Sequence, residues 1–210
     1  MKKFELTTES KMFWGKKLFR IRALISFDNV KKGELGGWVE KEENLSHFGN
    51  AWVSDNAHVG DDALVCDNAQ VYTNAGICGN AQISGNAHVC DNAHVFGNAW
   101  VYDNAQVYGS AYVLSDTMIC GDARVCGDAD HIVIGPIGSR KAYTTFYRRA
   151  DGETMVVCGC FHDTLIAFKK RVAEEHGDNQ HGKMYMAAIE FARKVINTNA
   201  VSEGKEGDTQ

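Results

Sequence analysis

The hydrophobic positions of this chain repeat with a period of six over a long central stretch. From Ala51 to Ala129 every sixth residue is alanine, with Thr117 as the exception. A valine or isoleucine stands two residues after each of these positions, from Val53 to Val125. Most of the alanines follow a Gly-Asn, Asp-Asn or Gly-Asp pair, so the unit is [G/D]-[N/D]-A-x-[V/I]-x.

A period of six fits neither an amphipathic helix nor a heptad repeat, and it does fit a short strand followed by a turn. The β-branched residue favours a strand and points inward, whereas the small alanine suits a crowded inner corner. Glycine, aspartate and asparagine accept the left-handed backbone angles of a sharp turn. Each hexad is therefore predicted to form one flat face of a coil, and successive coils pair as parallel strands.

The repeat resembles that of the hexapeptide-repeat left-handed β-helices, in which three hexads form one triangular coil, here 18 residues long. The aliphatic position followed four residues later by alanine, as in Val53 and Ala57, matches the motif of that class. The class often has Gly, Ala, Glu or Asp directly after the aliphatic. This chain has Ser54, Cys66 or Tyr72 there, so it matches a subtype.

The segment GGWVEKEENLSHFGNAWV and the NA-rich hexads after it resemble small hexapeptide-repeat proteins of bacteriophages and prophages. The resemblance covers about two thirds of the chain, and it indicates a fold rather than an activity. We expect a mainly β protein with a left-handed parallel β-helix of about five coils. The expected parts are an N-terminal β cap (1–35), the β-helix (36–131), a ββαα module (132–198) and a disordered tail (199–210).

The residues that follow the alanines are predicted to point outward and to stack in three columns, one on each face. The first column is Leu64, Gln82, Trp100 and Met118. The second is His58, Gly76, His94 and Tyr112. The third is Trp52, Gln70, His88, Gln106 and Arg124. A large exposed apolar column is typical of an interface, so the first column is the candidate subunit contact. The resemblance implies a homotrimer.

The C-terminal segment has a different pattern. AYTTFYR and TMVVCGC read as two strands around the turn ADGE. The next segment has Leu165, Phe168 and Val172 at helical spacing, with Asp163 or Thr164 as the N-terminal cap. Gly177 marks the end of this helix, and a second helix is predicted over 182–197.

Charge and composition exclude several classes of partner. The net charge is −5 and no basic block is present, so we expect no extended nucleic acid and no membrane surface as a partner. No apolar run approaches the roughly 20 residues that span a bilayer, and no export signal is visible, so we expect a cytoplasmic protein (the host cytoplasm if it is phage-encoded). The repeat cysteines are Cys66, Cys78, Cys90, Cys120 and Cys126. Their spacing in multiples of six indicates reduced thiols at one repeat position rather than a disulfide framework.

The first candidate site is GPIGSRK at 135–141, where a glycine-flanked turn leaves backbone N–H groups free beside Ser139, Arg140 and Lys141. Such a turn suits a phosphate or carboxylate, and Arg148 and Arg149 end the next strand. The structural alternative is an ordinary linker with solvated arginines. The predicted ligand-binding residues are Gly138, Ser139, Arg140, Lys141, Arg148, Gly159 and Phe161.

The CGCFH segment allows two interpretations. Cys158, Cys160 and His162 could bind zinc with His176 or His181 as a fourth ligand, but C-x-C-x-H is not a usual zinc spacing. The alternative is a strand end whose thiols pack as small apolar groups and whose glycine permits a close backbone approach. We assign no metal site and no cofactor.

Histidines of the repeat raise an enzymatic alternative. Hexapeptide acyltransferases are similar in fold and use a histidine as general base, for which His58, His88 and His94 are available. The register from 51 to 129 has no inserted loop of the kind that walls off an acceptor. His88 and His94 also share their position with glutamines in other coils, which indicates surface residues. No catalytic residue is assigned.

These observations favour a non-catalytic, oligomeric binding protein that holds a small phosphorylated ligand, such as a nucleotide, or a host factor. If the phage resemblance holds, its role would be to counter a host defence. The alternative is a hexapeptide-repeat acyl- or nucleotidyl-transferase. A third option is a structural assembly protein, for which stacking of the coils is sufficient.

Overall fold

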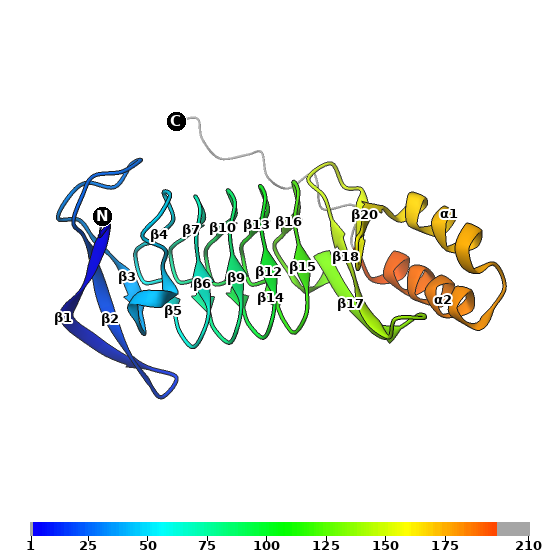
Figure 1. The fold of residues 1–210 in the computed structure, drawn as a ribbon, viewed down its shortest axis with the longest axis horizontal. Coiled ribbons are helices and arrows are strands. Elements are labelled where there is room, and N and C mark those ends of the chain that lie inside the picture. The colour runs from blue at the N-terminus through cyan, green and yellow to red at the C-terminus, as the bar shows by residue number, and fades with distance from the viewer. Residues whose placement is uncertain (1, 197–210) are drawn as a thin grey trace, which may run out of the picture. The chain divides into compact units, whose positions relative to one another are not determined.

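The structure is a computed structural model in which residues 2–196 are described (Figure 1). The chain divides into two compact units, one ending at Asp122 and the other beginning at Ala123. The first unit contains the N-terminal hairpin and the stacked coils, and the second contains an antiparallel sheet and two helices. The expected mainly β protein, with a parallel β-helix and a C-terminal helical module, is confirmed.

The first unit begins with two long antiparallel strands, β1 (Phe4–Phe13) and β2 (Lys16–Ala23), followed by β3 (Leu35–Val39) and a short 3₁₀ helix (Glu42–Asn44). Short strands then recur at every sixth residue. They are β4 (Trp52–Val53), β5 (His58–Val59), β6 (Leu64–Val65), β7 (Gln70–Val71), β8 (Gly76–Ile77), β9 (Gln82–Ile83), β10 (His88–Val89), β11 (His94–Val95), β12 (Trp100–Val101), β13 (Gln106–Val107), β14 (Tyr112–Val113) and β15 (Met118–Ile119).

Each short strand pairs in parallel with the strand three places later in the chain, and this pairing gives three sheets. Within the first unit their orders are β4-β7-β10-β13, β6-β9-β12-β15 and β3-β5-β8-β11-β14. Among the short strands β4 to β15, paired residues are 18 positions apart, as His88 is from Gln70 on one side and from Gln106 on the other. The three predicted columns are therefore confirmed for the residues of this unit.

The core of the coils consists of the two apolar positions of the repeat. In a central hexad Ala87 and Val89 are both 0% exposed, and the same positions are buried in all the other coils of the first unit. Burial of a valine side chain is worth about 1.5–3 kcal/mol relative to exposure. The small alanine and the branched aliphatic thus supply the apolar contacts that stabilise each coil.

The polar positions of the repeat have separate structural roles. In the first unit, the first residue of each turn pair has a left-handed φ, such as +57° at Asp61 and +64° at Gly85. Where it is aspartate, its carboxylate also accepts a hydrogen bond from a backbone N–H one coil later, as Asp61 does from Gly79 at 3.1 Å. The asparagine beside it forms a side-chain ladder, in which the Asn86 amide donates to Asn104 at 3.1 Å. The pair G/D-N therefore sets both the turn and the register.

The N-terminal end of the coils is closed by side-chain donors and by the hairpin. The Lys3 ammonium donates to the carbonyls of Gly49 and Ala51 at 3.3 and 2.7 Å. The buried Asn44 amide donates to the carbonyls of Asp61 and Ala63 at 3.0 and 2.8 Å. Burial lowers the pKa of Lys3 to about 8, so the group stays largely protonated at neutral pH.

The hairpin continues one of the three sheets, because β2 pairs antiparallel with β3 and β3 pairs parallel with β5. Within the expected N-terminal cap, the segment KKLFRIRA forms β2, and its Leu18, Ile21 and Ala23 are buried. The expected cap is therefore an extension of a sheet rather than a separate layer. None of the helices in the described residues is long and apolar enough to cross a membrane.

The second unit has more strands than the sequence indicated. After β16 (Arg124–Val125) and a 3₁₀ helix (Asp128–Asp130), four strands form an antiparallel meander. They are β17 (His131–Ile137), β18 (Ala142–Arg148), β19 (Thr154–Cys158) and β20 (Phe161–Thr164). The ββαα expectation omits β17 and β20. Pro136, taken as part of a turn, lies in an edge strand, where its missing N–H is tolerated.

Two helices pack on this sheet, α1 (Leu165–His176) and α2 (Gln180–Val195). The predicted cap and stop of α1 are confirmed, because the Thr164 hydroxyl accepts from the Ala167 N–H at 3.2 Å and Gly177 follows the last turn. The second helix begins earlier than 182 because the Asn179 side chain accepts from the Gly182 N–H at 3.0 Å. The predicted disordered tail, 199–210, lies outside the described residues.

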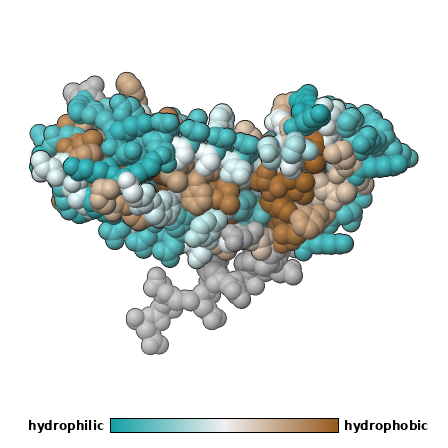
Figure 2. Space-filling model, turned by 90° about the horizontal axis from the view of Figure 1, so that it is seen from below, coloured by the Kyte–Doolittle hydropathy of each residue, from teal (hydrophilic) through white to brown (hydrophobic). Residues whose placement is uncertain are grey.

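The surface of the second unit includes a strongly hydrophobic patch, which Figure 2 shows in its right half. The strand at the edge of the four-stranded sheet, β17, has partly exposed Ile132, Val133 and Ile134. Ile132 and Ile134 also pack against the core between sheet and helices. Apolar surface is therefore present at the edge of this sheet as well as in its interior.

The left-handed turn position gives a stability prediction. Thr73 has a φ of +61°, although β-branched residues disfavour this region, and other coils have Asp, Gly or Ser there. We expect Thr73→Asn to raise the free energy of unfolding by about 1 kcal/mol, because asparagine tolerates the left-handed region. Urea unfolding followed by circular dichroism measures this. Thr73→Val keeps the branched side chain and should give no gain in the free energy of unfolding. An equal gain in both variants would contradict the claim that the backbone is strained at Thr73.

Candidate functional site

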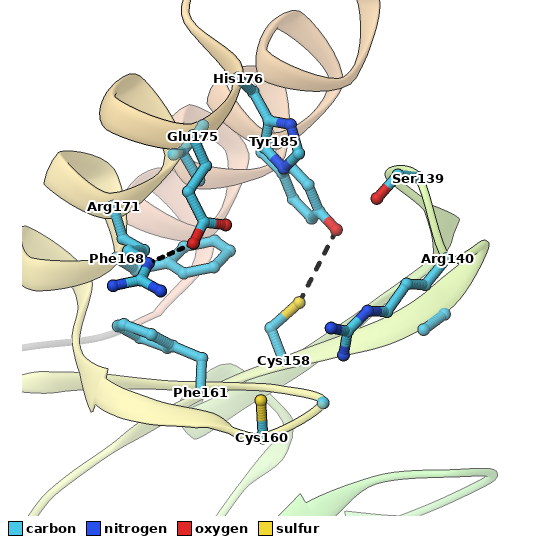
Figure 3. Close-up of a pocket in the computed structure, with 13 residues that line it drawn as sticks. Ser139, Arg140, Cys158, Cys160, Phe161, Phe168, Arg171, Glu175, His176 and Tyr185 are labelled. Atoms are coloured by element: carbon cyan, nitrogen blue, oxygen red, sulfur yellow. Dashed lines mark hydrogen bonds and ion pairs between the residues drawn. The ribbon is translucent and has the colours of Figure 1, made fainter.

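A cavity of about 360 Å³ lies within the second unit (Figure 3). Three parts of the unit contribute to its wall. These are the turn between β17 and β18, the turn between β19 and β20, and the facing sides of α1 and α2. The two turns are the GPIGSRK and CGCFH segments that the sequence singled out, so the fold brings both candidate segments to one place.

The turn between β17 and β18 is held in place by contact with α2. Gly138 has a φ of +73°, and a Cβ there would lie 1.9 Å from the Tyr185 hydroxyl oxygen. Only glycine therefore lets the phenol pack on this turn. The turn directs the Ser139 hydroxyl and the Arg140 side chain toward the cavity, as Figure 3 shows.

The turn between β19 and β20 forms the facing wall. Cys158 pairs with Phe161, so Gly159 and Cys160 form a two-residue hairpin loop. Gly159 has a φ of +61°, and a Cβ there would lie 3.2 Å from a terminal nitrogen of Arg140. The guanidinium therefore lies against the glycine. The predicted close approach at this glycine is made by the Arg140 side chain rather than by backbone.

Aromatic rings from three elements line the interior. The ring of Phe161 lies 5.1 Å from that of Phe168 on α1, and Phe168 lies edge-on to Tyr185 of α2 at 5.6 Å. His176 stacks on Tyr185 with the ring centroids 5.6 Å apart. This surface can receive a planar group by stacked or edge-to-face contact.

The cavity contains an excess of positive charge. Arg171 is bound by Glu175 at 2.6 Å, which Figure 3 marks with a dashed line. Arg140 has no carboxylate partner among the described residues. Burial raises the pKa of Tyr185 to about 12, so its phenol stays protonated at neutral pH. The Cys158 thiol donates weakly to the Tyr185 oxygen at 3.9 Å, which leaves the phenol proton available to a ligand.

The predicted ligand-binding residues separate into three groups. Ser139, Arg140, Gly159 and Phe161 line the cavity. Gly138 supports it through Tyr185. Neither Lys141 nor Arg148 is part of its wall.

Arg148 has a structural role near the start of the same unit. Its Nε donates to Asp130 at 2.8 Å, and both side chains are 4% exposed. Asp130 also accepts from the backbone N–H groups of Cys126 and Gly127 at 2.8 and 3.2 Å. Burial alone would raise the pKa of Asp130, but the Arg148 guanidinium and the Cys126 N–H lower it below its ordinary value. The interaction stabilises the unit and does not face the cavity.

The described residues do not support the zinc alternative. No three candidate ligands lie close enough together within residues 2–196 to hold a metal ion. His162, which the zinc set required, bonds instead to the Tyr147 hydroxyl at 2.7 Å. All seven cysteines are free thiols, including the five repeat cysteines whose spacing indicated it.

The other candidates lie in the first unit. Trp100 is 43% exposed in the column proposed as a subunit contact, and Gln82 is exposed beside the half-buried Leu64 and Met118. Of the histidines considered as catalytic bases, His88 and His94 lie on the outer surface, half-buried.

The third histidine, His58, is buried, which the sequence did not indicate.

Several wall residues were not identified from the sequence. Phe168, Val172 and Tyr185 read only as the apolar stripes of two helices, and they are indeed core residues. The sequence does not single out Arg171 or Glu175, and it suggests His176 only as a possible fourth zinc ligand. A signal was present in the pairing of glycine-rich turns with a tyrosine on an apolar stripe, because a buried tyrosine requires a partner for its hydroxyl.

No protein-family model matches this chain, and no curated protein matches its sequence. The chemistry of the cavity is accordingly inferred from its own residues.

The buried ion pair gives a prediction that separates structure from binding. Arg148→Met should destabilise the second unit by roughly 3–5 kcal/mol at pH 7, because it leaves Asp130 charged and buried without its partner. The pKa of Asp130 is lowered in the folded protein, so the stabilisation is present above its unfolded pKa and is lost as pH falls through its folded pKa. The deficit of the variant should therefore shrink below about pH 4.

Chemical unfolding at pH 7 and pH 3.5 measures the effect. Arg149→Met is the matched control, because Arg149 pairs with Asp151 and Glu153 at the surface and its loss should cost less than about 1 kcal/mol. Equal effects of the two substitutions at pH 7 would contradict the structural role of Arg148.

Proposed function

We propose that this protein is a binding protein whose second unit holds a small anionic ligand with a planar ring. The observation that carries the proposal is the meeting of two glycine turns at one aromatic cavity, where Arg140 has no carboxylate partner among the described residues. A guanidinium left without a carboxylate beside apolar walls is matched by an anionic group of the ligand.

The polar groups of the cavity suit a phosphate or a carboxylate. Arg140 presents several N–H donors in a planar fork that matches the oxygens of such anions. The Ser139 hydroxyl lies on the adjacent residue of the same turn, and the Tyr185 phenol provides a further donor. Because Glu175 already neutralises Arg171, the cavity retains about one positive charge. A ligand with one anionic group would pair with this charge.

The size of the cavity restricts the ligand further. Its volume of about 360 Å³ is near the lower end of the range of roughly 300–1,000 Å³ found for small-molecule sites. A mononucleotide or a similar aromatic phosphate is of suitable size, whereas a longer nucleic acid chain is too large. The ring would contact Phe161 and Phe168, and the phosphate would contact Arg140.

The proposed role is retention of the ligand, which would withhold it from other proteins. Sequestration of a nucleotide signal would use the same contacts to the ring and the phosphate. The alternative remains a transferase that uses His58, His88 or His94 as a base. Acetyl transfer from acetyl-coenzyme A that is lost in His58→Ala would contradict the binding proposal.

The binding proposal is tested with adenosine 5′-monophosphate as the probe and adenosine as its uncharged counterpart, by titration calorimetry on the full chain. We expect adenosine monophosphate to bind at least tenfold more tightly than adenosine. Arg140→Gln should remove this preference, because a hydrogen bond to a charged group contributes about 1.5–3 kcal/mol, which corresponds to tenfold or more.

Lys141→Gln is the matched control, because Lys141 is the next residue, is exposed and does not line the cavity. Its affinity should change less than about threefold. Equal affinity for the nucleotide and the nucleoside, no binding of either, or an equal loss in both variants would contradict the proposal. Chromatography of the nucleotide after overnight incubation should show it unchanged, and its conversion would contradict a non-catalytic role.

The homotrimer stays a prediction. Trp100→Glu places a charge in the column of Leu64, Gln82 and Met118, and we expect it to convert the assembly to monomers in light scattering. Gln106→Glu, an exposed position on another sheet, is the control and should leave the assembly intact. A wild-type monomer, or an assembly that survives Trp100→Glu, would contradict the proposed contact.

A further inference from the structure

A second cavity, of about 250 Å³, lies in the first unit beneath the turn of the β1–β2 hairpin. It is independent of the anion site proposed above. Its wall is mainly apolar. The residues of interest are Phe13, Trp14, Leu18, His58, Ile77 and Cys78.

His58 provides the polar feature of this cavity. Its side chain lies on β5, and the residue is 8% exposed. Its Nδ1 is 3.2 Å from the carbonyl oxygen of Asn56, which can only accept, so Nδ1 carries the proton. Its Nε2 therefore carries a lone pair, and that atom is buried without a partner in the described structure. A buried acceptor of this kind costs about 1–3 kcal/mol unless a donor reaches it.

The surroundings of His58 favour an uncharged partner. Burial lowers the pKa of His58 to about 4, with smaller contributions in the same direction from Lys11 and His94, so the imidazole is neutral at pH 7. Lys16 and Asp61 form an ion pair with one another at the cavity wall. The charges at this wall are therefore already balanced. What His58 Nε2 lacks is one hydrogen-bond donor.

Trp14 supplies a second, independent observation. It occupies the hairpin turn with a φ of +46°, followed by Gly15 at +77°. The first position of such a turn is normally Asn, Asp or Gly, and a bulky residue there is strained. The Trp14 side chain is nonetheless 59% exposed, so burial of its own surface does not account for its presence. Its ring stacks on His94 at 5.6 Å and forms part of the cavity wall.

We propose that this cavity binds a small, planar, uncharged aromatic molecule that donates one O–H or N–H hydrogen bond to His58 Nε2. Its ring would lie among Phe13, Trp14 and Ile77. A cavity of about 150 Å³ lined by apolar residues suffices for benzene, so about 250 Å³ holds a substituted or fused ring. The strained Trp14 then acts as a wall that closes over the bound ring.

Gly76 gives a second way to test the role of Nε2. It lies beside His58 in the same column, and a Cβ there would be 3.1 Å from His58 Nε2. Its backbone has no left-handed angle, so alanine fits the backbone conformation. Gly76→Ala therefore obstructs the acceptor while the imidazole itself is retained.

The experiment uses fluorine NMR of 4-fluorophenol, with 4-fluoroanisole as the probe that lacks the O–H donor. The full chain should shift and broaden the 4-fluorophenol signal in a saturable way and bind it at least fivefold more tightly than 4-fluoroanisole. His58→Leu should abolish this preference by weakening phenol binding alone. Trp14→Asn, which relieves the turn, should weaken both probes.

Two results would overturn the inference. One is equal or absent binding of the two probes by the unmodified chain, and the other is a preference for the phenol that persists in His58→Leu. If His58→Leu does not fold, Gly76→Ala decides the question, since it too should lose the preference. Gly127→Ala, at a glycine with no atoms within 4 Å of the added Cβ, is the matched control and should behave like the unmodified chain.

Discussion

The hydrogen bonds between successive coils are the constraint on which the first unit depends. Each hexad donates to the hexad one coil later, for example from Cys66, Asn68 and Gln70 to Ile83, Gly85 and Ala87, all at 2.9 Å. This register places identical positions directly above one another. The inner corner then has room only for a small side chain, which is alanine in every hexad of the first unit except at Thr117. The face requires a branched aliphatic, and the turn requires a residue that accepts a left-handed φ. The sequence is repetitive because every coil must form the same hydrogen bonds and packing contacts with the coils on either side of it.

A scaffold built in this way leaves specific chemistry to the positions that depart from the repeat. On the coil surface, the amide and carboxylate side chains of the turns form hydrogen bonds with one another from coil to coil. The two cavities with unmatched polar groups both involve segments outside the hexads. One lies under the N-terminal hairpin, with a buried imidazole that lacks a donor. The other lies between two glycine turns and two helices, with a guanidinium that lacks a carboxylate. The proposed ligands differ because these two unmatched groups differ.

The sequence predicts the repeat fold well, because a fixed period can be counted and each position has one physical requirement. It also indicates the two turns that meet at the cavity of the second unit, where we propose an anion site, since glycine beside serine and arginine describes a backbone that leaves donors exposed. The sequence does not reveal which of the polar side chains outside the repeat pattern are buried. Arg148 reads as a binding residue but is enclosed with Asp130, and His58 reads as a surface residue but is enclosed by Phe13. Such assignments depend on which segments pack together, and no local pattern encodes that.

The central claim is that the coils are held by hydrogen bonds in an 18-residue register, which hydrogen–deuterium exchange tests most directly. Amides that donate between coils, such as those of Cys66, Ser84 and Cys90, should exchange most slowly, whereas the exposed backbone of the turn at Ser139 and Arg140 should exchange rapidly. Protection that is uniform from the first coil to the last would support the account. Exchange in the hexads as fast as in that turn would contradict it.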